Sequence, residues 1–314
     1  MANTKISENI LAVVVTYNRR ELLRRCILFL QKQTNLNLEI LVVINGSTDG
    51  TKEMLKEFNL ITIEQENLGA AAGFQRGIDF ACKHNFKYCW LMDDDGYPHF
   101  QALDKLISHF DEGISCCAST VMCENDKNKF VFPYPRFNKR SFPIILSFNR
   151  KYKSLSQLKK KYNYDSYPFA HFFNGALIKV SALKKVGGIE KKLFIYGDEL
   201  DFFYRLKKTG KVITVIDAFH YHPEVNNRPF SNLKIFCYLR NSIFINNKYL
   251  DKSGIRNFLV ILVLIYRVIK RNGILKLIRL LFCIESNLFY LAIYKGIKGD
   301  LELQNKTKLF LDKT

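Results

Sequence analysis

The stretch that decides the fold reads Tyr88-Cys89-Trp90-Leu91-Met92-Asp93-Asp94-Asp95. A short apolar run of this kind is typical of a strand buried on both faces of a parallel sheet. The three carboxylates that follow repel one another and resist burial unless a cation or solvent relieves them. The stretch therefore predicts a buried strand with a charged site at its carboxyl end. An acidic surface turn is the alternative that it leaves open.

Strands and helices alternate on the N-terminal side of this stretch. Apolar runs predict strands at 10–16, 39–44 and 60–64, and helical spacing predicts helices at 20–32, 49–58 and 70–84. This alternation predicts an α/β fold with a mostly parallel sheet flanked by helices. In such a sheet, ligands bind at the carboxyl ends of the strands.

The predicted carboxyl ends are all polar. They carry Thr16, Tyr17, Asn18 and Arg19, then Asn45 to Asp49, then Asp93 to Asp95. In an extended chain Asp93 and Asp95 project the same way, whereas Asp94 projects oppositely. If the ligand is a nucleotide-diphosphate sugar, Asp94 is placed to reach its ribose. Carboxylate oxygens suit Mg²⁺ or Mn²⁺. We expect Asp93 and Asp95 to bind such a metal.

The segment Asn67 to Gly77 joins a predicted strand to a predicted helix and is rich in small residues. Small residues let a ligand approach the backbone, and a helix N-terminus favours anions. We expect Asn67 and Arg76 to contact a diphosphate donor. Close helix packing is the alternative explanation of the small residues.

Two further groups carry candidate chemistry. Asp198-Glu199-Leu200-Asp201 opens a probable helix, whose dipole favours an ionised general base, although plain N-capping explains the same pattern. His220 and His222 lie on one face of a strand at 212–222. Because Pro223 ends that strand, His222 lies at its rim and is favoured over His220 as a metal ligand.

The rest of the chain predicts a less regular order. A helix is expected at 101–110, strands at 116–123, 130–132 and 172–179, a helix at 182–186, a turn at Gly187-Gly188 and an irregular excursion at 133–168. The four prolines at 133, 135, 143 and 168 motivate the excursion. The domain prediction is a catalytic domain over 1–230 and a helical region over 231–314.

Composition limits the class of protein. The 314 residues are 48% hydrophobic, enough for a large core, and the net charge of +19 predicts a polyanionic partner. The eight cysteines lack metal-ligand spacing, which favours buried thiols. Residues 1–9 lack the pattern of a signal peptide, so we expect a cytoplasmic protein.

The helical region predicts a membrane partner. Residues 257–266 are apolar, a run about half as long as a bilayer span of about 20 residues. On a helical wheel, Arg256, Arg267, Lys270 and Arg271 fall on one narrow arc. Basic amphipathic helices bind anionic membrane surfaces. A helical subdomain that packs on the catalytic domain or on a second subunit is the alternative.

These motifs, in this order, resemble the inverting family 2 glycosyltransferases of the GT-A fold over residues 10 to about 225. The resemblance rests on six elements: the stretch 13–19, the loop 45–50, Asn67-Leu68-Gly69, Asp93-Asp94-Asp95, Asn174-Gly175-Ala176 with Gly187-Gly188, and the acidic motif with Arg205. Asn67 to Gly77 and the triple aspartate are similar to bacterial galactofuranosyltransferases and to rhamnosyltransferases of surface-polysaccharide assembly, such as that of O antigen.

The resemblance implies a role for each motif. Donor binding falls to Thr16, Tyr17, Asn18, Arg19, Asn45, Asn67, Arg76 and Asp94; metal binding to Asp93, Asp95 and His222; acceptor binding or support to Asn174, Gly175, Asp201 and Trp90. The family usually has Glu-Asp or Asp-Asp at this place, whereas this chain has Asp198-Glu199. Alignment with the family motif implies Glu199 as the base, and Asp198 is the alternative. Asn45 replaces the aspartate of many relatives.

The implied reaction is metal-dependent direct displacement with inversion at the anomeric carbon. UDP-galactofuranose is the leading donor and dTDP-rhamnose the second, with a lipid-linked saccharide as acceptor. We expect Mn²⁺ or Mg²⁺ as cofactor and a peripheral location on the inner face of the cell membrane. The sequence leaves homo-oligomer formation open.

Two other functions fit less well. A nucleic-acid-binding protein would explain the basic charge, but no helix-turn-helix, zinc-finger or ribonucleoprotein motif is present, and the acidic clusters would repel a polyanion. A nucleotidyltransferase is expected to have a Gly-rich, Lys-bearing phosphate loop near its start, and this sequence has none. That function would also leave the 198–201 motif unexplained.

Overall fold

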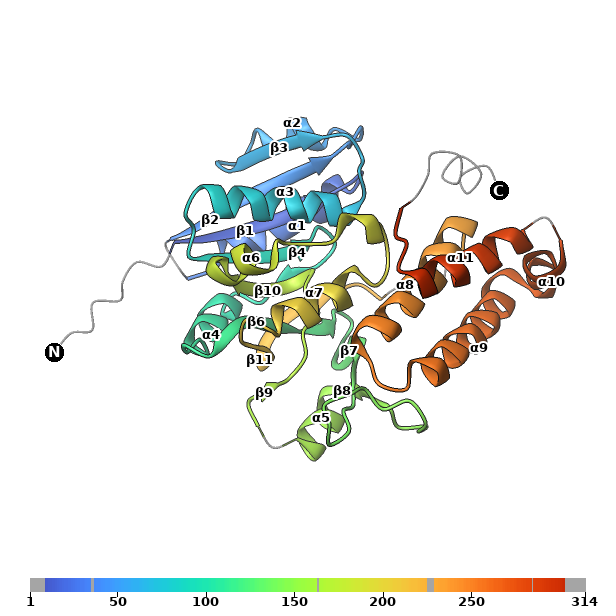
Figure 1. The fold of residues 1–314 in the computed structure, drawn as a ribbon. Helices are drawn as coiled ribbons and strands as arrows, with labels where there is room; N and C mark the ends of the chain where they lie inside the picture. The colour runs from blue at the N-terminus through green and yellow to red at the C-terminus, as the bar shows by residue number, and fades with distance from the viewer. Residues whose placement is uncertain (1–8, 35–36, 163, 225–228, 284, 303–314) are drawn as a thin grey trace. The chain divides into compact units, whose positions relative to one another are not determined.

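The computed structural model describes residues 9–34, 37–162, 164–224, 229–283 and 285–302 (Figure 1). Residues 1–8 lie outside this part, so the expectation about a signal peptide stays a prediction. The chain divides into two compact units. The first comprises Met1–Arg136, Leu146–Ile189 and Phe202–Glu224, and the second comprises Phe137–Ile145, Glu190–Asp201 and Val225–Thr314. The second unit therefore takes in two segments that precede the predicted boundary at residue 230.

The strands belong to the first unit. They are β1 (Ile10–Thr16), β2 (Leu38–Asn45), β3 (Ile61–Gln65), β4 (Tyr88–Asp93), β5 (Tyr97–Pro98), β6 (Ile114–Cys123), β7 (Asp126–Pro135), β8 (Lys151–Ser154), β9 (Ser166–Tyr167), β10 (Asn174–Lys179) and β11 (Lys211–His222). The main sheet has the order β3-β2-β1-β4-β10-β6-β11-β5. The first four strands in this order are parallel, β10 is antiparallel to both neighbours, and β11 is parallel to β6. The prediction of a mostly parallel α/β sheet is confirmed.

Helices flank this sheet. They are α1 (Arg20–Gln31), α2 (Thr51–Leu55), α3 (Ala70–Lys83), α4 (Ala102–Ser108), α5 (Leu155–Lys161), α6 (Val180–Val186) and α7 (Asp198–Leu206), which begins in the second unit and ends in the first. The side chains of β1 alternate between two helical layers. Ala12 and Val14 pack in the core cluster that contains α1, whereas Val13 faces α3. At that contact Gly77 lets the helix and strand approach, since a Cβ there would lie 2.2 Å from Val13 Cγ1.

The irregular excursion predicted at 133–168 is irregular only in part: residues 136–150 lie in no named helix or strand, whereas much of the rest is regular. This segment contains the end of β7, then β8, α5 and β9. Its order comes from aromatic packing: Tyr134 is fully buried and contacts Tyr167 and His171 edge to face, with ring centroids 5.9 and 5.1 Å away. The Tyr167 hydroxyl also donates a hydrogen bond to the Pro135 carbonyl at 2.6 Å. Proline spacing is a poor guide here because Pro133 and Pro135 lie within β7, whereas Pro143 lies in the irregular part and forms an isolated bridge with Phe137.

The second unit is helical. It contains a short 3-10 helix, η1 (Lys191–Leu193), followed by α8 (Asn232–Tyr249), α9 (Ser253–Asn272), α10 (Ile274–Phe282) and α11 (Ser286–Lys298). Its core joins all four α-helices through residues such as Phe236, Leu264, Leu280 and Phe289. Among the described residues no single helix is long and apolar enough to cross a bilayer, and α10 with α11 meets that test only as a pair bent by 67°.

The second unit is also held by buried polar groups. Arg240 is fully buried, and its guanidinium donates to the Leu301 carbonyl at 3.0 Å and to the Lys192 carbonyl at 3.1 Å. The neighbouring Asn241 amide donates to the carbonyls of Leu193, Ile195 and Tyr196 at 2.7–2.9 Å. These bonds tie the segment before α7 to α8.

Replacing Gly77 with alanine should destabilise the first unit. The new Cβ would overlap Val13, and overpacking of this kind costs about 1–3 kcal/mol, which exceeds the gain of up to about 1 kcal/mol in helix propensity. Urea unfolding followed by the fluorescence of Trp90, the chain's one tryptophan, measures the change. Val13→Ala in the Gly77→Ala background is the matched control, because it removes the overlapped methyl group. A double variant that loses the full sum of the two single costs would contradict the steric explanation.

Candidate active site

The motifs after β1, β2 and β4 lie at one edge of the sheet (Figure 1). β1 is the parallel partner of both other strands, with Thr16 opposite Ile44 and Val15 opposite Asp93. Parallel neighbours end on the same side, so the segments that follow them are close in space. The predicted convergence of these three segments is confirmed.

Asp94 is held inside the protein. Its side chain is buried, with Oδ2 accepting a hydrogen bond from Thr16 Oγ1 at 2.7 Å and Oδ1 accepting one from Arg19 Nη1 at 3.0 Å. Burial raises the pKa of Asp94, although Arg19 and Thr16 oppose this shift. Both oxygens therefore join β4 to the end of β1. This arrangement favours a connecting role for Asp94 over the predicted ribose contact.

Asp95 lies between a guanidinium and an imidazole. Arg19 Nη1 is 2.6 Å from Asp95 Oδ2, and His222 Nε2 at the end of β11 is 3.1 Å from Asp95 Oδ1. Burial disfavours the Asp95 carboxylate, but His222 and Arg19 outweigh burial and hold its pKa below the ordinary value. Burial likewise opposes charge on His222, but Asp95 outweighs it and raises the pKa of the imidazole.

The second nitrogen of His222 has its own partner. Nδ1 lies 2.6 Å from the Pro223 carbonyl oxygen, which assigns its proton to that bond and directs Nε2 toward Asp95. Metal-binding histidines are usually fixed in this way by a carbonyl or carboxylate on the opposite nitrogen. His222 is thus oriented as a ligand would be.

Of the three predicted metal ligands Asp93, Asp95 and His222, the last two lie in contact and fit a divalent cation. Asp95 Oδ1 is buried and, within the described residues, has no hydrogen bond of acceptable geometry. A carboxylate oxygen beside an imidazole nitrogen suits Mn²⁺ better than Mg²⁺, which prefers oxygen. No set of three His, Cys, Asp or Glu side chains surrounds a common point in the described part of the chain. Two protein ligands leave the other positions to substrate phosphates and water, as is common for such ions.

His220 is enclosed and does not reach this edge. Its side chain is fully buried, and neither ring nitrogen has a hydrogen-bond partner among the described residues. A Cβ on Gly96 would lie 2.2 Å from His220 Nε2, and one on Gly175 would lie 3.1 Å from Nδ1. Gly96 and Gly175 therefore have to be glycine for the ring to fit. Of the two candidate histidines, His222 is the one placed beside a carboxylate.

Asn174 belongs to the same layer. It is buried at the start of β10 and pairs with Met92 of β4, next to Asp93, whose backbone N–H donates to the Phe173 carbonyl at 2.7 Å. Asn174 and Gly175 thus support the strand that ends in the carboxylates. Trp90 is fully buried in the core cluster and is likewise a supporting residue.

Asn45 connects the loops around the second strand end. Its buried amide donates to Asn67 Oδ1 at 3.2 Å, and its Oδ1 accepts from Gln65 Nε2 at 2.9 Å and from the Leu68 N–H at 3.2 Å. This set of bonds favours a structural role over the predicted contact with a base. Gly46 permits it, since a Cβ there would lie 2.9 Å from the Asn67 nitrogen.

A pocket adjoins the first loop. It has a volume of about 390 Å³ and is lined by Asn18, Arg19, Asp49 and three residues of the first turn of α1. Asn18 spans its loops: its N–H donates to Ser47 Oγ at 3.0 Å and its Oδ1 accepts from the Thr48 N–H at 2.7 Å. The pocket is within the size range of small-ligand sites.

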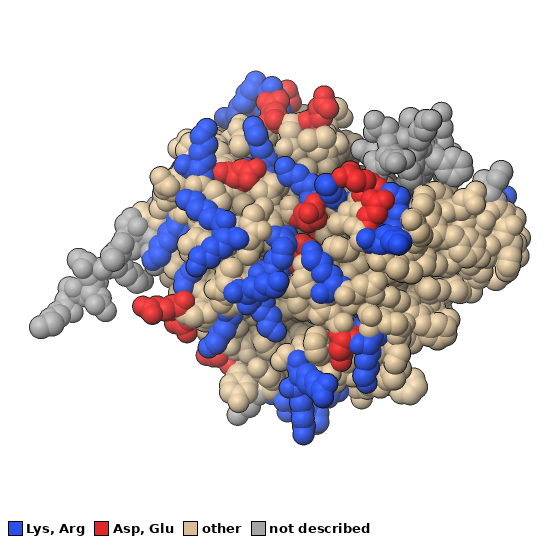
Figure 2. Space-filling view, in the orientation of Figure 1, with Lys and Arg blue, Asp and Glu red and all other residues tan. Residues whose placement is uncertain are grey.

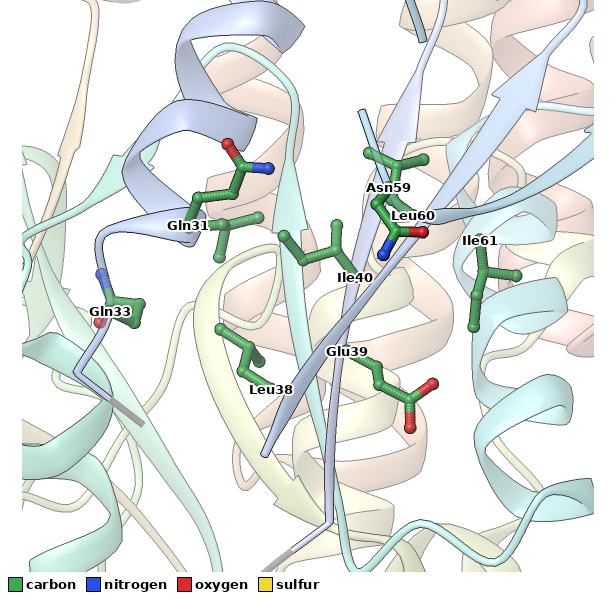
Figure 3. Close-up of a pocket in the computed structure, with 9 residues that line it drawn as sticks. Gln31, Gln33, Leu38, Glu39, Ile40, Asn59, Leu60 and Ile61 are labelled. Carbon is green, nitrogen blue, oxygen red and sulfur yellow. The ribbon is translucent and has the colours of Figure 1, made fainter. Parts of the chain in front are cut away.

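Other predicted donor contacts are exposed. Tyr17 is 48% exposed beside this loop, and Arg76 is exposed on α3. A second pocket, of about 560 Å³, lies at the opposite ends of β2 and β3 and is lined by Gln31, Gln33, Glu39 and neighbouring side chains (Figure 3). It contains none of the predicted site residues.

The acidic motif opens α7. Asp198 is buried, and burial raises its pKa to about 6 against the opposing effect of backbone N–H groups. Glu199 is half-buried, whereas Asp201 is 1% exposed. Asp201 Oδ1 accepts hydrogen bonds from the Tyr249 hydroxyl at 2.7 Å and from Lys248 Nζ at 3.2 Å. Asp201 therefore anchors the motif to the end of α8.

Sequence reasoning missed Gln75, which braces the Gly187-Gly188 turn together with Arg205. Gln75 Oε1 accepts a hydrogen bond from the Ile189 N–H at 2.6 Å, and Arg205 Nη1 donates to the carbonyls of Val186 and Gly188 at 2.9 and 2.6 Å. The sequence signal for Gln75 was its position: it is a polar residue among the small and apolar residues on the buried face of α3.

Comparisons with known proteins agree with this geometry. Residues 11–187 match the family model described as Glycosyl transferase family 2. The chain is 30% identical over 227 residues to galactofuranosyltransferase GlfT1 of Mycobacterium tuberculosis, a match that covers 69% of this chain and 71% of that relative.

Two solved structures are similar in fold. One is S. aureus TarS in complex with UDP-GlcNAc, with a TM-score of 0.57, 15% identity and coverage of 93% of this chain and 82% of that one. The other is mannosyltransferase PcManGT from Pyrobaculum calidifontis in complex with GDP-Man and Mn²⁺, with a TM-score of 0.53, 14% identity and coverage of 97% and 83%. The family match spans more than half of the residues, and the fold is shared with these enzymes. The chain therefore belongs to glycosyltransferase family 2 and has the GT-A fold.

Proposed function

We propose that this glycosyltransferase transfers galactofuranose from UDP-galactofuranose, with inversion and with a divalent cation, to a growing lipid-linked saccharide of a surface polysaccharide. The proposal places the reaction at the cytoplasmic face of the cell membrane, where the nucleotide sugar would be available. The similarity to GlfT1 over 227 residues supports the choice of sugar.

One observation carries the proposed chemistry. Asp95 and His222 meet at the sheet edge, where Asp95 Oδ1 is buried 3.1 Å from His222 Nε2 without an aligned hydrogen bond, and Arg19 lies on the other side of the same carboxylate. This edge combines metal ligands with a cation that suits a diphosphate. The adjoining pocket by Asn18 and Asp49 offers space for part of the nucleotide.

The proposed transfer is a direct displacement at the anomeric carbon. The acceptor hydroxyl loses its proton to a carboxylate of the 198–201 motif, and its oxygen attacks the anomeric carbon. The bond from that carbon to the diphosphate breaks, and UDP leaves with the electron pair. Asp95 and His222 would hold a divalent cation, which would neutralise charge on the diphosphate. Arg19 adds a second positive charge from the protein itself.

Two carboxylates are candidates for the base. Glu199 is the base by register with the family, and its side chain is half-buried. Asp198 is the alternative, and its pKa of about 6 suits a general base near neutral pH. Asp201 is excluded from this role because its carboxylate is engaged by Tyr249 and Lys248.

Removing the metal ligands should stop transfer. Asp95→Asn and His222→Ala should each lower kcat/KM by about 100-fold or more, because a lost metal contact removes several kcal/mol of stabilisation from the transition state. Mn²⁺ affinity, measured by electron paramagnetic resonance without any sugar donor, should fall in parallel. Glu39→Gln, an exposed acid at the opposite edge of the sheet, is the matched control. Wild-type Mn²⁺ affinity in both site variants would exclude this metal site.

The base can be identified by substitution and by pH. Glu199→Gln should lower kcat by about 100-fold or more, because general-base catalysis contributes about 10²–10⁴-fold, and donor binding should persist. Asp198→Asn should then retain most of the turnover. If Asp198 is the base instead, it must be ionised, so the wild-type rate should fall as the pH drops through about 6 and Asp198→Asn should be the inactive variant. Full turnover in both variants would rule out this motif.

A panel of sugar nucleotides tests the donor. Under the proposal, UDP-galactofuranose should be hydrolysed or transferred fastest, with saturation transfer difference NMR detecting its binding. A preference for dTDP-rhamnose or for another donor would overturn the choice of sugar while leaving the family assignment intact. The Glu199→Gln variant, tested with the same panel, separates donor binding from turnover.

A further inference from the structure

Exposed apolar side chains gather on three helices of the second unit. Within the described residues, twelve of the twenty exposed large hydrophobic side chains lie on α9, α10 and α11. They are Ile255, Phe258, Leu262, Tyr266, Ile269, Ile274, Leu275, Ile278, Phe282, Tyr290, Tyr294 and Ile297. Figure 2 shows that the visible surface over α9 and α10 is almost wholly uncharged, whereas lysine and arginine are spread over the visible surface of the first unit. Concentrations of this kind mark binding surfaces.

The apolar stripe on α9 is a true helix face. Phe258, Leu262, Tyr266 and Ile269 follow one another at intervals of three or four residues, so they lie on one side. Phe258 and Tyr266 are 61% and 64% exposed. The core contacts of α9 are made by other positions, such as Leu264 and Val268.

The basic arc predicted for the surface of α9 is largely turned inward. Arg256 is 5% exposed and pairs with Asp251 at 2.6 Å, while also donating to the Pro143 carbonyl at 2.9 Å. Arg267 lies over the ring of Tyr238 and Arg271 over that of Phe230, at 5.1 and 4.4 Å. Aromatic rings and a carboxylate of the same unit thus engage these three arginines, although Arg267 and Arg271 remain partly exposed, and their membrane contact stays a prediction.

α10 and α11 repeat this division. Leu277 and Leu280 of α10 and Leu288 and Ala292 of α11 lie in the core, and the opposite faces carry exposed apolar side chains. Ile274, Leu275, Ile278 and Phe282 are exposed on α10, and Tyr290, Tyr294 and Ile297 on α11. The unit thus has one apolar surface that it buries and another that it leaves open.

The charge on this open surface has a single sign. Between residues 253 and 298 the sequence has one acidic residue, Glu285, which is buried and pairs with Lys276 at 2.8 Å. The exposed charges on the three helices are Lys270, Arg279 and Lys298. An apolar centre with basic residues around it and tyrosine hydroxyls among the apolar groups matches the boundary between acyl chains and anionic headgroups.

We propose that the exposed face of α9, α10 and α11 binds a lipid bilayer, with its apolar side chains inserted below the headgroups and Lys270, Arg279 and Lys298 at the phosphates. Insertion dominates and charge is secondary, because most of the α9 cations are engaged inside the unit. A second copy of the chain fits this face less well: a two-fold interface would bring the same three cations together without an acidic partner on these helices. The proposal stands apart from the choice of donor sugar.

The test is sedimentation of the full chain with phosphatidylcholine vesicles, with and without about 25% phosphatidylglycerol. The variant Phe258→Ser with Leu262→Ser and Tyr266→Ser should lower the vesicle partition coefficient by about tenfold or more. Leu146→Ser with Phe148→Ser is the matched control, since these side chains are 71% and 107% exposed outside the three helices. Circular dichroism verifies that each variant is folded. Donor hydrolysis in solution, without vesicles, should be unchanged in both.

Salt distinguishes insertion from adsorption. At about 1 M NaCl the Debye length falls to about 3 Å, and most wild-type binding should survive. Release of the protein by salt, or equal binding by the triple variant and the wild type, would overturn the proposal. So would the absence of vesicle binding, including the case in which the wild type is a dimer and the triple variant a monomer. Failure of the donor assay with intact vesicle binding would count against the proposed function alone.

Discussion

Three consecutive carboxylates at the end of a buried strand are the constraint on which the charged edge of the first unit depends. Because like charges this close repel one another, neighbouring carboxylates of this group take different partners. Asp94 turns inward to Thr16 and Arg19, whereas Asp95 turns to His222. The ends of β1 and β11 are thereby tied to the end of β4. Asp95 Oδ1 lies 3.1 Å from His222 Nε2 but not in hydrogen-bonding alignment with it, and this buried oxygen beside an imidazole suits a cation.

The fold could be predicted where local pattern decides it. The strand expected at 10–16 has those bounds, and the three polar segments converge because parallel strands that follow one another end on the same side. The insertion of β10 and the arrival of β11 depend on pairings between distant segments, which periodicity does not encode. For this reason the sequence predicts Asp95 and His222 as metal ligands separately, whereas the contact between them is visible only in the structure.

The site differs most from the sequence-based picture where polar side chains serve the protein itself. Asn45 has the chemistry of a base contact, yet its amide joins three segments of the loop. His220 has the chemistry of a ligand, yet Gly96 and Gly175 enclose its ring. Residue type gives the capability of a side chain, and only packing determines whether a substrate or a neighbour uses it. Asp201 shows the same point in the second unit, where Tyr249 and Lys248 engage a carboxylate that otherwise looks catalytic.

The orientation of α9 shows that a helical wheel separates a basic arc from an apolar arc but does not tell which of the two faces solvent. A basic arc is expected to face solvent, but arginine stems are apolar and guanidinium groups pack well on aromatic rings. Arg267 and Arg271 use Tyr238 and Phe230 in this way, so the basic arc can face the interior. The apolar arc is then exposed, which is unfavourable in water and increasingly so as neighbouring helices add to it. Because the arginines of α9 pack against aromatic rings of the second unit, the apolar arc of this helix is left on the outside, where an apolar medium would stabilise it.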